Sequence, residues 1–329
     1  MKPTSFDQLP PELKLEIAKH LPPQDLGTLA MTSTNHRTLF QPLVDVSKLL
    51  HYVAHSEKNA VRYMLLKEIN LILKRGSVTD CSERTFEGIS GFEYALWALD
   101  MDMCTMILNC IPDNETGHKV LVKLLAQYNK VKTEGIKYTL SGNPVTEKHF
   151  DFNDTIIKEL RVGERLARGI RMSRDVSVVD QHWRESIGGA QKLIPMHVHL
   201  SYYPKPQNSV NSLSTLDTMM RFRQECVDAV KKLLSVGEST SNNSFFPNAL
   251  SKISQKTWLS SDSKLGKDFA LYRGVQGKVV VKYGAPFEHT TTRNLTELSR
   301  LFNTKANDFI NFQSEFEKRV ALKISLEFK

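Results

Sequence analysis

The sequence has few cysteines, no long apolar segment and no leader-like start. Its four cysteines form no Cys-x-x-Cys pair, which excludes zinc-ribbon and thioredoxin-type motifs, and we predict free thiols in a reducing compartment. No apolar run approaches the ~18–20 residues that a membrane-spanning helix requires. Residues 1–7 lack the apolar core of a signal peptide. We therefore expect a chain without a transmembrane segment or a secretory leader.

Common catalytic signatures are also missing. The sequence contains no Walker loop, no Gly-x-Gly-x-x-Gly, no His-Glu-x-x-His and no Gly-x-Ser-x-Gly. These patterns mark nucleotide sites, dinucleotide sites, zinc proteases and α/β-hydrolases. We therefore predict no metal and no cofactor, except under one alternative for residues 261–329 that involves NAD.

The composition is that of a globular chain with an uneven charge distribution. The 329 residues are 40% apolar and 24% charged, with a net charge of +8. Residues 1–120 carry 12 basic and 15 acidic side chains, whereas residues 121–329 carry 32 and 21. The change of sign along the chain indicates at least two modules with different roles.

Residues 1–45 show the strongest pattern, a set of short amphipathic helices. Four apolar residues recur at every fourth position: Leu9, Leu13, Ile17 and Leu21. Pro22 and Pro23 end this first helix, and a second follows with Leu26 and Leu29. Thr32 to Asn35 supply caps for a third, short helix. Three such helices are too small to bury all their leucines, so we expect them to use a partner.

This pattern resembles the F-box over residues 5–45. The resemblance rests on Leu9-Pro10-x-Glu12-Leu13, Ile17, Leu21-Pro22-Pro23-x-Asp25-Leu26, Leu29 and Thr32-Ser33-x-Asn35. It implies that the segment binds a Skp-family adaptor of a cullin–RING ubiquitin ligase, with seven docking residues: Leu9, Pro10, Leu13, Ile17, Leu21, Leu26 and Leu29. The third helix departs from the pattern, with Thr32, Ser33, Asn35 and His36 where many F-boxes have Cys and Trp. The alternative is an ordinary amphipathic start whose leucines face the rest of the chain.

Residues 46–130 contain a degenerate repeat. Residues 50–54 and 92–96 align at an offset of 42, and each segment precedes a short polar break and a second helix. The pattern resembles ankyrin-type helical hairpins without the Thr-Pro-Leu-His signature. We predict stacked hairpins that present a surface to a client protein.

Residues 131–260 are predicted to be a basic helical region that follows a loop or hairpin at 133–149. The helix predicted over 150–173 has a basic side that consists of Lys158, Arg161, Arg165, Arg168, Arg171 and Arg174. This side either contacts an acidic partner or an anionic membrane surface, or is a solvated face that pairs with Glu159 and Glu164. No interleaved aromatics support base stacking, so we do not predict nucleic-acid binding.

Histidines in the same region allow a second interpretation. His197 and His199 have the i, i+2 spacing of metal ligands on a strand, but no third ligand lies nearby in the sequence. We predict a structural role for them.

Several further segments resemble a region shared among secreted effectors of Legionella and related intracellular bacteria. They are 91–100, His182-Trp183, 188–191, Ile194-Pro195-x-His197-Val198 and 264–274. The resemblance implies type IV secretion into the host cytoplasm, which would explain the absence of a leader. It also gives a bacterial chain a reason to carry an F-box, because that segment would recruit the host ligase.

Residues 261–329 are predicted to be a helical cap with a short hairpin, and they carry the enzymatic alternative. The order Arg273, then Thr290, Thr291 and Thr292, then Glu315 and Glu317 is similar to the motifs of mono-ADP-ribosyltransferases, which use NAD. Residues 277–283 have the pattern of a strand. Residues 294–302 and 307–319 are predicted to be helices, which would place both glutamates on a helix.

These observations predict a mainly α chain: a three-helix F-box, ankyrin-like hairpins, a basic helical region and a helical C-terminal segment with a small hairpin. The predicted function is that of an adaptor without catalytic residues of its own, which brings an unidentified host client to a Skp–cullin ligase. The transferase and the basic helix as a binding module are the alternatives.

Overall fold

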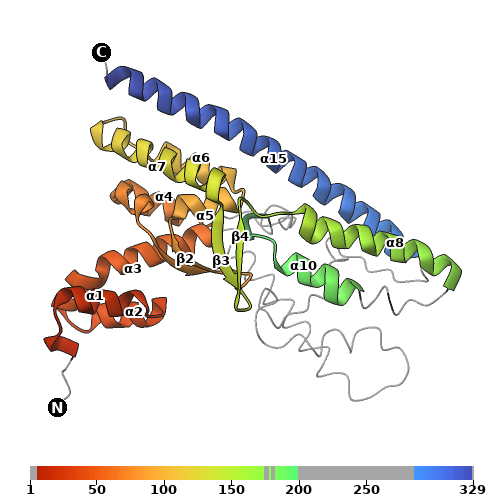
Figure 1. Ribbon diagram of the computed structural model, residues 1–329, viewed down its shortest axis with the longest axis horizontal. Coiled ribbons are helices and arrows are strands. Elements are labelled where there is room, and N and C mark those ends of the chain that lie inside the picture. The colour runs from red at the N-terminus through yellow and green to blue at the C-terminus, as the bar shows by residue number, and fades with distance from the viewer. Residues whose placement is uncertain (1–5, 174–177, 179–181, 199–284, 328–329) are drawn as a thin grey trace, which may run out of the picture. The chain divides into compact units, whose positions relative to one another are not determined.

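The computed structural model describes residues 6–173, 178, 182–198 and 285–327 (Figure 1). The chain divides into two units, which we treat separately. The first consists of Met1–Asp80, Arg84–Phe150 and Asp308–Lys329, and the second of Cys81–Glu83 and Asp151–Asn307. The predicted F-box and repeat segments therefore belong to one unit. The described residues are mostly helical, as the sequence predicts.

The N-terminal helices begin where the sequence predicts them. A 3-10 turn, η1 (Phe6–Gln8), precedes α1 (Pro11–Lys19) and α2 (Pro23–Met31), and each α-helix has proline in its first turn, where the missing N–H costs nothing. The Ser33 hydroxyl caps α3 (Thr34–Ala54) by accepting the N–H of His36 at 3.1 Å. The prediction of a short third helix is wrong, because α3 is 21 residues long and continues past Pro42 to Ala54. The predicted boundary at residue 45 therefore falls inside a helix.

The three helices share a small core centred on Phe40, which is fully buried. Four smaller apolar residues surround it: Ala18, Leu26, Ala30 and Val44. The His36 ring packs at 5.5 Å from Phe40 and edge-on at 5.9 Å from Phe6, measured between ring centroids. His36 therefore supplies an aromatic contact at the point where the sequence departs from the usual F-box pattern.

Two helical hairpins follow, as the repeat predicts. The first joins the end of α3 to α4 (Lys58–Lys67), and the second joins α5 (Gly91–Trp97) to α6 (Met101–Asn109). Ser56 and Leu99 occupy equivalent turns with φ of 58° and 57°. In both turns the next N–H donates to a carbonyl five residues earlier. The structural equivalence is shifted by one residue from the sequence offset, and the relation to ankyrin repeats stays a prediction.

The two hairpin turns also contact each other. The Ser56 hydroxyl donates to the Asp100 carboxylate at 2.9 Å, and Lys58 pairs with Asp102 at 2.7 Å. α3 packs against α5, and α4 against α6. The hairpins are therefore stacked, as in a helical repeat array.

A four-stranded antiparallel sheet interrupts the helices. Its strands, in spatial order, are β1 (Gly76–Thr79), β2 (Thr85–Ile89), β3 (Ile136–Leu140) and β4 (Asn143–Glu147). The β3–β4 hairpin lies within 133–149, where a loop or hairpin is predicted, whereas β1 and β2 lie within 46–130, where the sequence predicts only helical hairpins. A 3-10 segment, η2 (Ile69–Leu73), precedes the sheet, and α7 (Glu115–Glu134) separates its two hairpins.

A buried ion pair stabilises the β1–β2 turn. Arg84 is 1% exposed and donates to the Asp80 carboxylate at 2.9 Å. The guanidinium also lies 5.1 Å from the Trp97 ring and 5.0 Å from the Phe150 ring. Burial lowers the pKa of Arg84, but Asp80, Tyr94 and Tyr138 together raise it by more, so the net pKa is raised and the charge is retained.

The second unit contains the basic helix. A π-helical turn, η3 (Asn153–Ile157), leads into α8 (Lys158–Ser173), and η4 (Trp183–Ile187) and α10 (Gly188–Lys192) follow. Its core includes Ile157 and Leu160, each 1% exposed. Phe152 stacks on Phe302 at 3.9 Å between ring centroids. The helix predicted over 150–173 is therefore present but begins at Asn153, with an irregular first turn.

The last element is α15 (Ala285–Glu327), a continuous helix of 43 residues. It replaces the two shorter helices predicted over 294–302 and 307–319. In the first unit, Phe316 is fully buried and packs edge-on against Phe92 and Tyr128. The strand predicted at 277–283 lies outside the described residues. Among the described helices, none is both long and apolar enough to cross a membrane.

Candidate functional site: the exposed face of the N-terminal helices

α1 carries an apolar face that its own unit leaves uncovered. Leu13 is 52% exposed and Ile17 is 44% exposed, one helical turn apart. Pro10 is exposed at the start of the same helix, and Leu9 is partly buried. Ala18, on the opposite side, is fully buried in the small core. The structure therefore brings four of the seven predicted docking residues to one end and one side of α1.

The other three predicted docking residues have different positions. Leu21 and Leu29 are partly buried and pack against the core cluster. Leu26 is 5% exposed and belongs to that core. We therefore reassign Leu26 from the docking surface to the core of the three-helix module. The four-residue spacing of the α1 leucines did not show which side of α2 faces inward.

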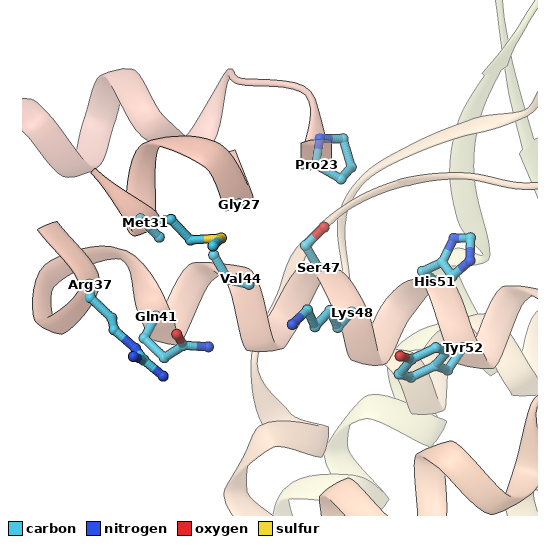
Figure 2. A pocket seen from close by; sticks show the side chains of 11 residues that line it. Pro23, Gly27, Met31, Arg37, Gln41, Val44, Ser47, Lys48, His51 and Tyr52 are labelled. Atoms are coloured by element: carbon cyan, nitrogen blue, oxygen red, sulfur yellow. The ribbon is translucent and has the colours of Figure 1, made fainter. Parts of the chain in front are cut away.

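The end of α2 adds an exposed side chain that the docking prediction omitted. Met31 is 85% exposed and borders a groove between α2 and α3 (Figure 2). Gly27 lies on the α2 side, and Arg37, Lys48 and His51 are the basic residues of the α3 side. The groove is thus apolar near Met31 and basic along α3, and Gly27 leaves it open because it has no side chain.

Ionisable groups around the module mostly pair with one another. The Lys14 ammonium donates to the Asp7 carbonyl at 2.9 Å, and His36 Nε2 lies 3.2 Å from the Asp7 carboxylate. His51 is exposed on α3, but partial desolvation of its ring, followed by the nearby His55, lowers its pKa to about 4. His51 is therefore neutral at physiological pH, and the positive charge of the groove comes from its lysine and arginine.

The basic side chains predicted on α8 lie on the solvent face of that helix. Lys158, Arg161, Arg165 and Arg168 are all exposed, whereas Leu160 is buried. The side chain of Arg171 and the whole of Arg174 lie outside the described residues. The predicted basic face is thus present over four residues.

The residues of the transferase alternative do not form a site in the described chain. Arg273 lies outside the described residues, and α15 contains the others: Thr290, Thr291, Thr292, Glu315 and Glu317. Glu315 and Glu317 are exposed, and residues two apart on a helix point in different directions. Burial and then Glu317 raise the pKa of Tyr128 to about 12, and both residues belong to the first unit.

Of the two histidines considered as metal ligands, the structure describes only His197. His197 is 6% exposed in a short helical turn, and His199 lies outside the described residues. Within the described ranges, no group of three metal-ligating side chains comes together.

Comparison with known proteins gives two family matches and one relative. The F-box domain family matches residues 6–41, and the family of the CBUA0006 C-terminal domain matches residues 155–316. An uncharacterized Coxiella burnetii protein, CBUA0006, is 28% identical over 281 residues, which are 80% of this chain and 73% of that protein. No solved structure matches. The comparisons therefore support an F-box domain in α1, α2 and the first part of α3, and a second shared region that includes α8.

Proposed function

We propose that the chain is a ubiquitin-ligase adaptor whose F-box binds a Skp-family protein through the exposed face of α1. The exposure of Leu13 and Ile17 supports this most directly, because apolar side chains half exposed one turn apart lose water contact when a partner covers them. The family match over residues 6–41 supports a Skp-family partner, since F-box domains generally bind Skp1.

In this proposal the chain contributes proximity and no chemistry. The F-box holds the cullin ligase, and the remainder of the chain holds a client protein. Ubiquitin transfer then becomes effectively intramolecular, with a local client concentration on the order of millimolar. The stacked hairpins and the region matched over 155–316 are the parts of the chain that are available for a client.

The proposal also includes delivery into a host cell. The relative from Coxiella burnetii supports a bacterial context, and an F-box would give a bacterial protein access to the host ligase. We propose type IV secretion as the route. A translocation reporter fused to the chain tests this separately, because its signal requires entry into host cytoplasm and does not depend on adaptor binding.

The adaptor role is tested by affinity purification from host lysate. Tagged chain should recover a Skp-family protein and a cullin together with an unidentified client. The Leu9→Ala, Pro10→Ala variant should lose the adaptor and cullin but keep the client. Undiminished recovery of the adaptor by this variant would contradict the proposed docking surface.

A further inference from the structure

The solvent face of α8 is a row of four basic residues on a rigid support. Lys158, Arg161, Arg165 and Arg168 follow one another at steps of three and four, so they share one side of the helix. The opposite side is anchored, since Leu160 is 1% exposed and η4 packs against α8. We call these four residues the basic face.

The neighbouring acids leave most of this face uncompensated. Glu164 pairs with Arg168 at 2.9 Å. Glu159 points elsewhere: its carboxylate lies 3.6 Å from His182 Nε2, which also contacts the Glu159 carbonyl at 2.9 Å. Of the two acids expected to pair with the basic face, only Glu164 does so, and it pairs with Arg168.

Three charges of the basic face therefore lack an acidic partner within the described part of the chain. Lys158, Arg161 and Arg165 form no ion pair with any described residue. Arg161 and Arg165 are like charges one turn apart, an arrangement that is unfavourable in a helix. A ligand of opposite charge would remove this repulsion and form charge-assisted hydrogen bonds with the guanidinium groups.

The chemistry of the face selects among anionic ligands. A membrane-surface helix inserts its apolar side into lipid, but here that side is packed inside the unit, as Leu160 shows. Single-stranded nucleic acid requires aromatic platforms, and the exposed residues described on α8 are charged or glycine. Of the anionic ligands considered, protein carboxylates fit best, because a guanidinium can bind a carboxylate in a bidentate manner.

We propose that the basic face binds an acidic segment of a partner protein, in which Asp or Glu recurs with helical spacing. The step of four residues from Arg161 to Arg165 spans about 6 Å along the axis, which is also the distance between carboxylates four residues apart on a second helix. Under the proposed adaptor function this partner is the client, but the surface does not depend on the F-box.

The test uses the full chain and a labelled 16-residue peptide with Glu at every third or fourth position. Fluorescence anisotropy should show saturable binding that weakens as salt rises towards physiological strength. The same peptide with Gln in place of Glu should bind about tenfold or more weakly, because neutral Gln forms no ion pair with the guanidinium groups. Equal binding of the two peptides, or no binding of either, would overturn the proposal.

Charge-reversal variants locate the binding. Arg161→Glu with Arg165→Glu should abolish peptide binding. Lys123→Glu with Lys130→Glu makes the same change in net charge at exposed positions of α7 and should leave binding within about threefold. An equal loss in both variants would show that net charge, and not this face, attracts the peptide.

Two competing ligands complete the experiment. Vesicles rich in phosphatidylserine and an oligouridine strand should bind more weakly than the Glu peptide, and tighter binding of either would refute a protein partner. All variants should keep their affinity for a Skp-family adaptor. If the wild-type chain binds the peptide but no adaptor, the F-box proposal fails and the basic face stands.

Discussion

Leu13→Ala with Ile17→Ala removes the two most exposed apolar side chains of α1. Burying such a side chain completely contributes about 1.5–3 kcal/mol. About half of each remains to be buried, at 52% and 44% exposure, so the pair should contribute about 2 kcal/mol to docking. This corresponds to a roughly 30-fold rise in Kd for a Skp-family adaptor. Stability should change by less than about 0.5 kcal/mol, because both sites are exposed on a helix and alanine is a good helix former.

Isothermal titration calorimetry with purified adaptor measures the change. Tyr63→Ala with Leu66→Ala is the matched control, because these α4 side chains are 60% and 65% exposed in the same unit. The control should bind like the wild-type chain. A loss below about threefold for the α1 variant, or an equal loss for the control, would refute the assignment of the docking surface to α1.

Three other substitutions test the structure around the site. Leu26→Ala should cost about 2–5 kcal/mol of unfolding free energy in a denaturant titration, and an unchanged midpoint would contradict its place in the core. Asp80→Ala should cost about 3–5 kcal/mol by leaving Arg84 buried without its carboxylate, whereas an unaffected melting temperature would show that the pair is not buried. His51 has a folded-state pKa of about 4 against an ordinary 6.5, so the unfolded chain binds more protons between those values and stability falls as pH drops through them. His51→Gln should therefore make the melting temperature fall less steeply from pH 6.5 to pH 4, and an identical slope would exclude this contribution.

Local signals in the sequence predicted the helical start well. Pro11 and Pro23 mark first turns, and Ser33 caps α3, because these residues act through their own backbone neighbours. The continuation of α3 past Pro42 was not predictable in this way. An exposed proline inside a helix is tolerated only when packing on both sides offsets the lost hydrogen bond, and packing of that kind involves distant residues.

In the candidate sites, too, the sequence predicts the features that depend on neighbouring residues and not those that depend on distant ones. The four-residue spacing predicts that Leu13 and Ile17 lie on one face of α1, and both side chains are exposed in the structure. The spacing could not distinguish that face from the core side of α2, so Leu26 was assigned to the docking surface. On α8 the sequence identified the basic face but not the orientation of Glu159, which depends on His182, 23 residues away. Contacts between distant residues decide both points.

The central claim is that this chain connects a cullin ligase to a client through its F-box. The most direct measurement mixes purified full-length chain with a Skp-family adaptor and a cullin and determines the masses of the complexes in solution. We expect a ternary complex with one copy of each protein. Without the adaptor, the chain and the cullin should not associate. A chain that stays separate from the adaptor–cullin complex at micromolar concentrations would contradict the account.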